Sequence, residues 1–268
     1  MNKEDLVSVI MPTYNAGKYL ADSMNSILNQ TYKNLELLIT DDASTDPTTL
    51  QLLKEYASKD ERVKILYLKE NHGAGYARNK SIERAKGRYI AFCDSDDRWT
   101  TDKLEKQIAF MNKKKCALSC ASYIIFDGET QDEIGFCTAP KKITYGMMKR
   151  DNKVGCLTAI YDVQMLGRKF FMPTIRKRQD WALFLQIIRE CKVCYAYPDK
   201  PLAYYCMRRN SISSNKMSLM KYNIAVYKEI LGFHPIKANL YFFTLFLPTY
   251  GVKILKRKFD SYTFTHRK

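Results

Sequence analysis

The sequence predicts an α/β fold with a mostly parallel central sheet and helices on both faces. Over the first 95 residues, short apolar runs alternate with segments in which apolar residues recur at helical spacing. A polar cluster follows most of these runs, and units of this length are typical of parallel strands joined by helices. A less regular pattern after residue 100 indicates a smaller antiparallel extension.

The first half alternates strands and helices in chain order. The expected strands are the apolar runs at residues 7–11, 35–40, 63–68 and 89–93. The expected helices lie at residues 17–29, from residue 47 onward and at 75–85. Asp46 and Pro47 open the second helix in the favoured order, because a capping carboxylate precedes a proline at the first helical position.

After residue 100, single strands interrupt the regular alternation. The expected strands lie at residues 118–126, 155–161 and 202–207, and the expected helices at 103–115, 180–190, 219–231 and 241–250. We therefore expect one domain at residues 1–215 with two functional halves, 1–100 and 101–215. A helical extension follows at residues 216–268.

Composition excludes disorder and localises the charge. The 268-residue chain is 46% hydrophobic and carries a net charge of +16. Residues 1–110 hold 16 basic and 17 acidic side chains, whereas residues 111–268 hold 28 and 11. The basic half therefore indicates a partner with anionic groups. The polar start predicts no signal peptide, and no apolar run reaches the ~18 residues of a membrane span.

The eight cysteines are irregularly spaced. Without a secretion signal we expect reduced thiols, most of them small core residues. Cys191 and Cys194 have metal-like spacing, but Cys116 and Cys120 make a poor second pair, so no zinc site is predicted.

Polar clusters follow the carboxyl ends of four expected strands, at residues 13–15, 41–42, 71–73 and 94–97. Such strand ends meet at the edge of a sheet where ligands bind, so the clusters predict a single site. Asp94, Asp96 and Asp97 would repel one another without a counter-charge. A magnesium or manganese ion bound through oxygen supplies one. The alternative is a solvated turn.

Four motifs in order resemble the signature of family 2 glycosyltransferases. They are VSVIMPTYN at residues 7–15, ITDDASTD at 39–46, NHGAGYARN at 71–79 and FCDSDDRW at 92–99. The resemblance covers about residues 5 to 215. It implies the GT-A fold, a Rossmann-like sheet with an acceptor-side extension, and a nucleotide-activated sugar donor.

The resemblance also implies roles for single residues. It implies a nucleotide site formed by Pro12, Thr13, Tyr14, Asn15, Asp42, Asn71, Arg78 and Asp94. Asp42 matches the residue that hydrogen-bonds a uracil-type base, and Asp94 the residue on the ribose side. Asp96, with Asp97 close by, matches the ligand of a Mn²⁺ or Mg²⁺ on the diphosphate. Which of these two carboxylates binds the metal stays open.

An inverting transfer requires a carboxylate that takes the proton of the acceptor hydroxyl. Asp180 matches this position, and Gln179 replaces the usual glutamate of the family. Asp180 also suits a helix N-cap, a role compatible with the first. A second segment also departs from the family pattern: Cys206 stands where the family often has an arginine, and Arg208 stands where it often has a histidine. The residues expected to contact the diphosphate or the acceptor are Arg176, Arg178, Trp181, Arg208 and Arg209. The alternative for Trp181 is a role in packing. The alternative for residues 176–178 is a solvated loop.

The segment 236–258 combines aromatic and aliphatic residues with basic ones. It suits a helix in an anionic membrane interface or a helix packed on the core. We therefore expect a metal-dependent inverting transferase that uses a UDP-sugar and a glycan or glycolipid acceptor, peripheral on the cytoplasmic face of a membrane. A sugar nucleotidyltransferase would need a glycine-rich phosphate loop after the first strand. A nucleic-acid-binding module is disfavoured by the neutral first half, so no nucleic acid partner is expected.

Overall fold

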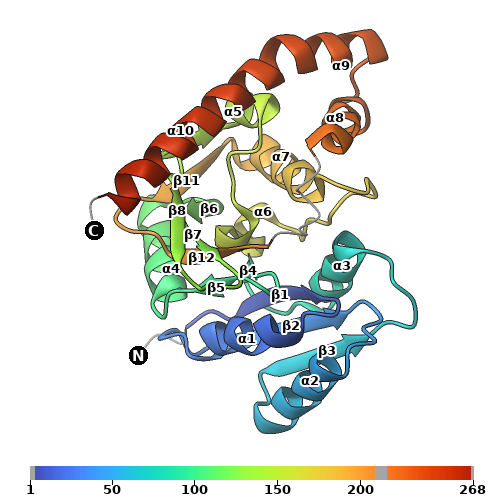
Figure 1. Ribbon diagram of the computed structural model, residues 1–268, viewed down its shortest axis with the longest axis vertical. Coiled ribbons are helices and arrows are strands. Elements are labelled where there is room, and N and C mark those ends of the chain that lie inside the picture. The colour runs from blue at the N-terminus through green and yellow to red at the C-terminus, as the bar shows by residue number, and fades with distance from the viewer. Residues whose placement is uncertain (1–3, 209–215, 267–268) are drawn as a thin grey trace.

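The computed structural model describes residues 4–208 and 216–266, with the side chains of residues 216–219 outside the description. Within these residues, eight strands form a central sheet in the order β3-β2-β1-β4-β10-β6-β11-β9 (Figure 1). They are β1 (Val7–Thr13), β2 (Leu35–Asp41), β3 (Val63–Tyr67), β4 (Tyr89–Phe92), β6 (Leu118–Ala121), β9 (Lys142–Thr144), β10 (Ile160–Asp162) and β11 (Val193–Tyr197). The strands β3, β2, β1 and β4 are parallel, and β10 pairs antiparallel with β4. The predicted α/β class is confirmed.

A smaller sheet within the described residues has the order β5-β12-β7-β8. Its strands are β5 (Arg98–Trp99), β12 (Ala203–Met207), β7 (Tyr123–Asp127) and β8 (Glu133–Cys137). The prediction of one strand at 118–126 is wrong, because the chain changes sheets at Ser122. There the carbonyl oxygen of Ser122 accepts from Leu202 N, and its Oγ accepts from Ala139 N. The predicted strand at 155–161 begins instead with the 3-10 turn η2 (Cys156–Thr158) and becomes β10 only at Ile160.

Helices cover both faces of the large sheet. The helical elements of residues 4–208 are η1 (Gly17–Tyr19), α1 (Leu20–Leu28), α2 (Pro47–Lys59), α3 (Ala74–Arg84), α4 (Lys103–Lys114), α5 (Tyr145–Arg150), α6 (Val163–Leu166) and α7 (Gln179–Cys191). One apolar core includes Ile82 of α3 and Leu183 of α7, and a second core includes Met24 of α1 and Leu104 of α4. Asp46 caps α2 as predicted, since its carboxylate accepts from Thr49 N at 2.8 Å.

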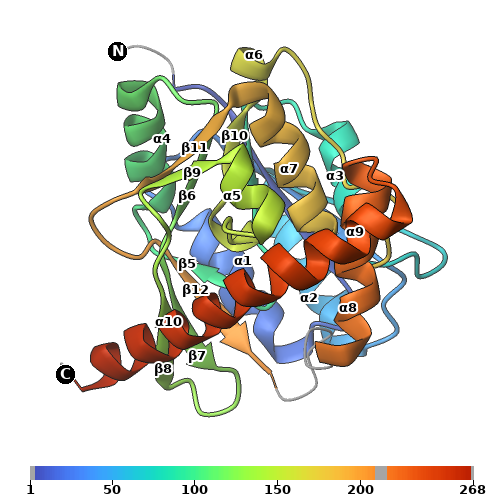
Figure 2. The ribbon, with the colours of Figure 1, turned by 90° about the horizontal axis from the view of Figure 1, so that it is seen from above.

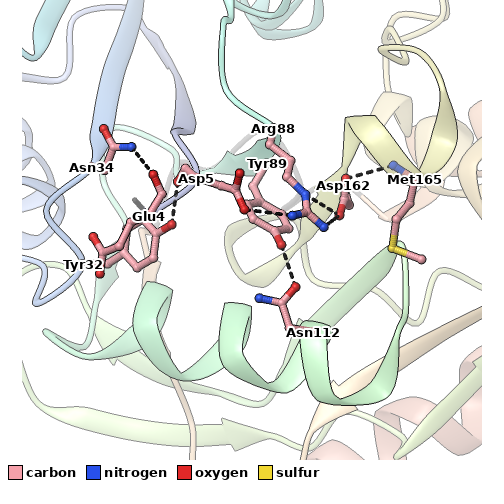
Figure 3. A network of polar contacts seen from close by, with 9 residues as sticks. All are labelled: Glu4, Asp5, Tyr32, Asn34, Arg88, Tyr89, Asn112, Asp162 and Met165. Carbon is pink, nitrogen blue, oxygen red and sulfur yellow. Dashed lines mark hydrogen bonds and ion pairs between the residues drawn. The ribbon is translucent and has the colours of Figure 1, made fainter. Parts of the chain in front are cut away.

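An ion-pair network anchors the amino-terminal edge of the sheet (Figure 3). The polar clusters follow the opposite ends of the parallel strands. The guanidinium of Arg88, at the start of β4, pairs with Asp5 and with the buried Asp162, both at 2.8 Å. Asp162 also caps α6 by accepting from Met165 N. These contacts fix the first strand, β4 and the antiparallel β10 to one another.

Residues 216–265 form helices on the outside of the second half. They are α8 (Lys216–Ala225), the π-helical turn η3 (Val226–Ile230), α9 (Pro235–Tyr241), the π-helical turn η4 (Phe242–Phe246) and α10 (Leu247–Thr265). α9, η4 and α10 follow one another without a break and form one long rod (Figures 1 and 2). Among the residues described, no helix combines the length and the apolar content that crossing a bilayer requires.

Candidate active site

Backbone and side-chain hydrogen bonds tie three of the predicted strand-end clusters together. The carboxylate of Asp42 accepts from His72 N at 2.9 Å and from Gly73 N at 2.7 Å. Asn71 Nδ2 donates back to the carbonyl oxygen of Asp42, and Asp42 N donates to Thr13 O. The loops after β1, β2 and β3 therefore form one continuous wall, as their position at the sheet edge predicted.

Within this wall the predicted nucleotide residues differ in exposure. Tyr14 is 51% exposed, whereas Thr13 is buried and its Oγ1 has no hydrogen-bond partner among the described residues. Asn15 adopts φ +45°, and its Oδ1 accepts from the backbone N–H groups of Thr45 and Asp46. Tyr14 thus presents its ring at the surface, and Asn15 ties this loop to the segment after β2.

Arg78 links α3 to the acidic turn after β4. Its Nη2 lies 2.5 Å from Asp94 Oδ1, and the guanidinium is buried. Burial lowers the pKa of Arg78, but the Asp94 carboxylate and, more weakly, Asp180 raise it above the ordinary value. The charge of Asp180 therefore acts on the same guanidinium as that of Asp94, which brings residues from α3, the acidic turn and α7 into one site.

The carboxylates of Asp96 and Asp97 point in different directions. Asp97 is buried, and its Oδ1 accepts from Cys206 N at 2.9 Å. Asp96 Oδ2 lies 2.5 Å from Arg208 Nη2 and borders a small pocket of about 200 Å³. Burial, followed by the neighbouring Asp94, raises the pKa of the Asp96 carboxyl. An arginine thus neutralises the carboxylate that sequence matched to the metal ligand.

Among the described residues, no group of three histidine, cysteine or acidic side chains has the geometry of a metal site. Magnesium and manganese usually take only one or two protein carboxylates and complete their shell with water and substrate phosphates. The oxygens of Asp94 and Asp96 are both partly exposed, at 35% and 16% of their side chains, and fit that donor set. The inward-facing Asp97 fits it less well.

Asp180 lies in the first turn of α7, and its Oδ2 accepts from Asn152 Nδ2 at 2.8 Å. The prediction that Asp180 caps this helix is wrong, because the helix begins at Gln179 and the cap position is Arg178 at φ +67°. Asn152 was not predicted, and nothing in the polar segment around it distinguished it from a solvated loop.

The side chain of Gln179 packs directly on α3. A Cβ added to Gly75 would lie 2.2 Å from Gln179 Nε2, so only glycine permits this contact. The residue that departs from the usual family glutamate therefore lies against the NHGAGYARN motif. The same motif ends in Asn79, whose side chain exchanges two hydrogen bonds with the backbone of Met172 and so holds the segment before α7.

The predicted diphosphate and acceptor contacts have mixed outcomes. Trp181 is fully buried, its Nε1 donates to Met148 O, and its ring packs against Tyr227 and Phe246. Stacking of Trp181 on a sugar is therefore wrong, and the packing alternative holds. Arg178 Nε donates to Asn223 of α8, Arg176 is exposed, and Arg209 lies outside the described residues.

A contact that sequence did not indicate closes the pocket beside Asp96. Glu129, in the turn between β7 and β8, accepts from Lys18 Nζ at 2.8 Å and from Tyr19 Oη at 2.9 Å. The Arg208 guanidinium lies over the Tyr19 ring at 5.4 Å. The smaller sheet therefore reaches across to the helix after β1.

Comparison with known proteins agrees with this geometry. A family model described as glycosyl transferase family 2 matches residues 8–171. The chain belongs to this family. TuaG of Bacillus subtilis (strain 168), whose name assigns it to teichuronic acid biosynthesis, is 44% identical over 240 residues, which are 89% of this chain and 93% of TuaG. WfgD of Escherichia coli, named UDP-Glc:alpha-D-GlcNAc-diphosphoundecaprenol beta-1,3-glucosyltransferase, is 38% identical over 81% of this chain and 83% of its own length.

Solved structures share the fold of this glycosyltransferase. Residues 1–349 of S. aureus TarS in complex with UDP-GlcNAc align with a TM-score of 0.65 at 21% identity, over 88% of this chain and 70% of that one. The mannosyltransferase PcManGT from Pyrobaculum calidifontis, in complex with GDP-Man and Mn²⁺, aligns with a TM-score of 0.64 at 16% identity, over 95% and 75%. The GT-A fold implied by the motifs is confirmed.

Proposed function

We propose that this glycosyltransferase moves a sugar from UDP to a hydroxyl of a lipid-linked polysaccharide intermediate, with inversion and with a divalent metal. WfgD and WfaP, which carry the same descriptive name and are 38% and 36% identical to this chain, support the UDP donor and an acceptor on a lipid diphosphate. The observation that carries the reaction type is the position of Asp180 in the first turn of α7, next to Gln179, whose side chain lies against Gly75 of the segment after β3.

Asp180 is the base in this proposal. Asn152 holds one carboxylate oxygen, and the other has no hydrogen-bond partner among the described residues and can accept from the acceptor hydroxyl. As that hydroxyl attacks the anomeric carbon, its proton passes to Asp180 and the bond to the diphosphate breaks on the opposite face of the sugar. Because Gln179 packs on Gly75, the first turn of α7 stays at a fixed position relative to the nucleotide wall.

The leaving diphosphate requires positive charge. A bound Mg²⁺ or Mn²⁺ would be held by Asp96, with Asp94 beside it, and would supply Lewis-acid help to the departing group. The Asp96–Arg208 ion pair must then open, which frees the Arg208 guanidinium to bind phosphate oxygens. Arg78 pairs with Asp94 at 2.5 Å and holds that carboxylate in place, with Asp94 assigned to the ribose side.

The donor and the acceptor are assigned to the two halves of the chain that meet at the edge of the sheet. Residues 1–100 bind the donor through the side chains or backbone of Pro12, Thr13, Tyr14, Asn15, Asp42, Asn71, Arg78 and Asp94. Residues 101–215 bind the acceptor, and residues 216–268 form an extension. A lipid-linked acceptor brings the enzyme to a membrane surface, and UDP-sugars place it on the cytoplasmic face. No observation favours a nucleotidyltransferase or a nucleic-acid-binding module.

Asp180→Asn tests the proposal. We expect UDP binding by calorimetry to stay near the wild-type value, because Asp180 does not touch the nucleotide wall. Transfer from a UDP-sugar to a lipid-diphosphate acceptor should fall by about 10²- to 10⁴-fold, the usual contribution of a general base. Glu61→Gln, which changes an exposed carboxylate in the turn between α2 and β3, is the matched control. Unchanged turnover of Asp180→Asn would remove the base assignment.

Asp96→Ala tests the metal assignment separately. Manganese should strengthen UDP binding to the wild type and lose that effect in the variant, as measured by titration with and without the metal. Equal manganese dependence in both proteins would contradict the role of Asp96. Asp97→Ala would then be the next variant, because the sequence left the choice between the two carboxylates open.

A further inference from the structure

The C-terminal rod formed by α9, η4 and α10 has one face packed on the enzyme. Ala238, Phe242 and Phe246 are buried against the core that contains Trp181. Further along, Ser261 Oγ accepts from Phe136 N of β8, and the ring of Phe264 stacks on Phe136 with centroids 5.6 Å apart. The rod is therefore fixed in orientation by contacts at both of its ends.

The opposite face of the rod carries what we call the apolar stripe. It consists of Ile236, Leu240, Phe243, Leu247, Val252, Leu255, Phe259 and Tyr262. Each of these residues is between 41% and 74% exposed. Single exposed apolar residues are ordinary on protein surfaces, but a contiguous row along one helix marks a surface that binds a partner or a membrane.

The π-helical turn η4 brings the two halves of the stripe onto one face. Residues 236, 240 and 243 repeat at helical spacing, and so do residues 252, 255, 259 and 262. At about 100° per residue, an uninterrupted α-helix would turn the second set more than a quarter-turn away from the first. A π-turn adds about one residue and so rotates α10 by about 100° in the opposite sense, which realigns the two sets. The π-turn therefore places both sets of apolar residues on the same outer face of the rod.

Basic side chains border the stripe. Lys256 and Lys258 are exposed and, at about 100° per residue, lie on opposite flanks of the set 252–262. Lys237 is exposed beside Ile236. The one acidic residue of the sequence between 236 and 268 is Asp260, whose carboxylate accepts from Thr138 on the inner face. The outer face of the rod therefore combines apolar residues in the middle with positive charge at its margins.

We propose that the apolar stripe is a membrane-binding surface for an anionic bilayer. The rod lies in the plane of the interface with the stripe among the acyl chains and Lys256 and Lys258 at the headgroups, an arrangement typical of amphipathic interfacial helices. A second copy of the chain fits this face less well, because the same face of that copy offers no carboxylate to these lysines: Asp260, the one acidic residue of the sequence between 236 and 268, bonds to Thr138 on the inner face. The inference deepens the proposed function by naming the surface that brings the enzyme to a lipid-linked acceptor.

The fold gives this surface an orientation. The rod lies on the outside of the second half of the chain, at the end of the molecule remote from β1, β2 and β3 (Figure 1). Because its inner face is fixed to β8 and to the core around Trp181, binding of the stripe turns the acceptor half toward the lipid. The nucleotide wall then faces the aqueous phase, from which a soluble donor arrives.

Vesicle binding tests the proposal with the full chain. We expect the protein to co-sediment with vesicles that contain phosphatidylglycerol and to bind pure phosphatidylcholine vesicles more weakly. Leu255→Gln/Phe259→Gln should weaken binding by roughly tenfold or more, because two exposed apolar side chains no longer enter the lipid. Lys256→Gln/Lys258→Gln should weaken binding by roughly fivefold for each charge at low salt and have little effect at high salt.

Matched controls come from the same chain. Met165→Gln removes an apolar side chain that is 50% exposed on α6, and Lys69→Gln/Lys113→Gln removes two exposed charges away from the rod. Both should bind vesicles like the wild type. Equal vesicle binding by the stripe and control variants would overturn the proposal. So would a wild-type dimer in light scattering that the Leu255→Gln/Phe259→Gln change dissociates. UDP binding is measured on every variant as well. Loss of UDP binding would count against the proposed function, whereas unchanged vesicle binding by the stripe variants would count against this surface.

Discussion

Lys103 is the residue whose replacement gives the most quantitative test of the fold. It lies at the start of α4, is completely buried, and its Nζ has no hydrogen-bond partner among the described residues. Its Nζ lies over the ring of Trp99, 4.2 Å from the ring centroid, in a cation–π contact. Burial lowers the pKa of Lys103 from 10.5 to about 7, so at neutral pH the folded state holds this proton only partly.

The sign of the pH effect follows from proton counting. The unfolded chain binds the Lys103 proton up to its ordinary pKa, whereas the folded chain releases it near neutrality. Between these two values the unfolded state holds more protons, so the contribution of Lys103 to stability rises with pH. A tenfold change in proton affinity is worth about 1.4 kcal/mol. At pH 7 the lowered pKa of Lys103 therefore reduces the free energy of unfolding by on the order of 4 kcal/mol, compared with a lysine whose pKa does not change on folding.

Lys103→Met removes this loss and also removes the contact between the ammonium and Trp99, which is worth up to about 2 kcal/mol. We therefore expect the variant to be about 2–4 kcal/mol more stable than the wild type at pH 7 in urea titrations. The difference should shrink by about 1.5 kcal/mol by pH 8.5, because the wild type regains stability. Lys113→Met, an exposed position of the same helix, should show neither effect. A Lys103→Met protein that is less stable at pH 7, or a difference independent of pH, would refute the reasoning.

Three further changes address packing and the site. Trp181→Ala should cost about 3–5 kcal/mol of unfolding free energy in urea, since it empties a fully buried site and leaves Met148 O without its donor; a loss near zero would mean that the C-terminal helices do not pack there. Gly87→Ala should lower Tm, because the new Cβ would lie 2.6 Å from Ser8 N, a backbone atom that cannot move aside; an unchanged Tm contradicts that close approach. Asp42→Asn should weaken UDP binding roughly five- to tenfold in calorimetry, because one of its two backbone N–H bonds to the next loop loses its acceptor; wild-type affinity would show that this loop does not shape the nucleotide site.

Local signals predicted the first half of the fold well. Asp46 followed by Pro47 specified the start of α2 without reference to any distant residue. Four polar clusters after apolar runs predicted which loops meet, and the hydrogen bonds that join Asp42 to Thr13, His72 and Gly73 confirm that three of them do. Such features are predictable because capping, strand polarity and sheet-edge geometry depend on short stretches of chain.

The failures depend on partners far along the sequence. The apolar pattern of residues 118–126 is continuous, and the sheet change at Ser122 follows from hydrogen bonds to residues 139 and 202. Trp181 follows a residue assigned to catalysis, but its environment is set by Tyr227 and Phe246. The start of α7 lies at Gln179 because Arg178 takes a left-handed conformation and donates to Asn223. No local pattern carries that information.

The hydrogen bond from Cys206 N to Asp97 has a consequence for how the enzyme comes into being. It joins residues 109 positions apart, and the pairing of β12 with β5 beside it spans a similar length of chain. The strands β3, β2, β1 and β4 use only residues up to 92, so this part of the large sheet can assemble while the ribosome is still making the second half. The buried Asp97 carboxylate of the acidic turn, by contrast, lacks the Cys206 N–H donor until residue 206 has been synthesised and the long loop has closed. Nascent chains of this enzyme therefore pass through a stage in which the first half of the large sheet is folded and the acidic turn is incompletely bonded, and the turn gains this contact only after residue 206 has been made.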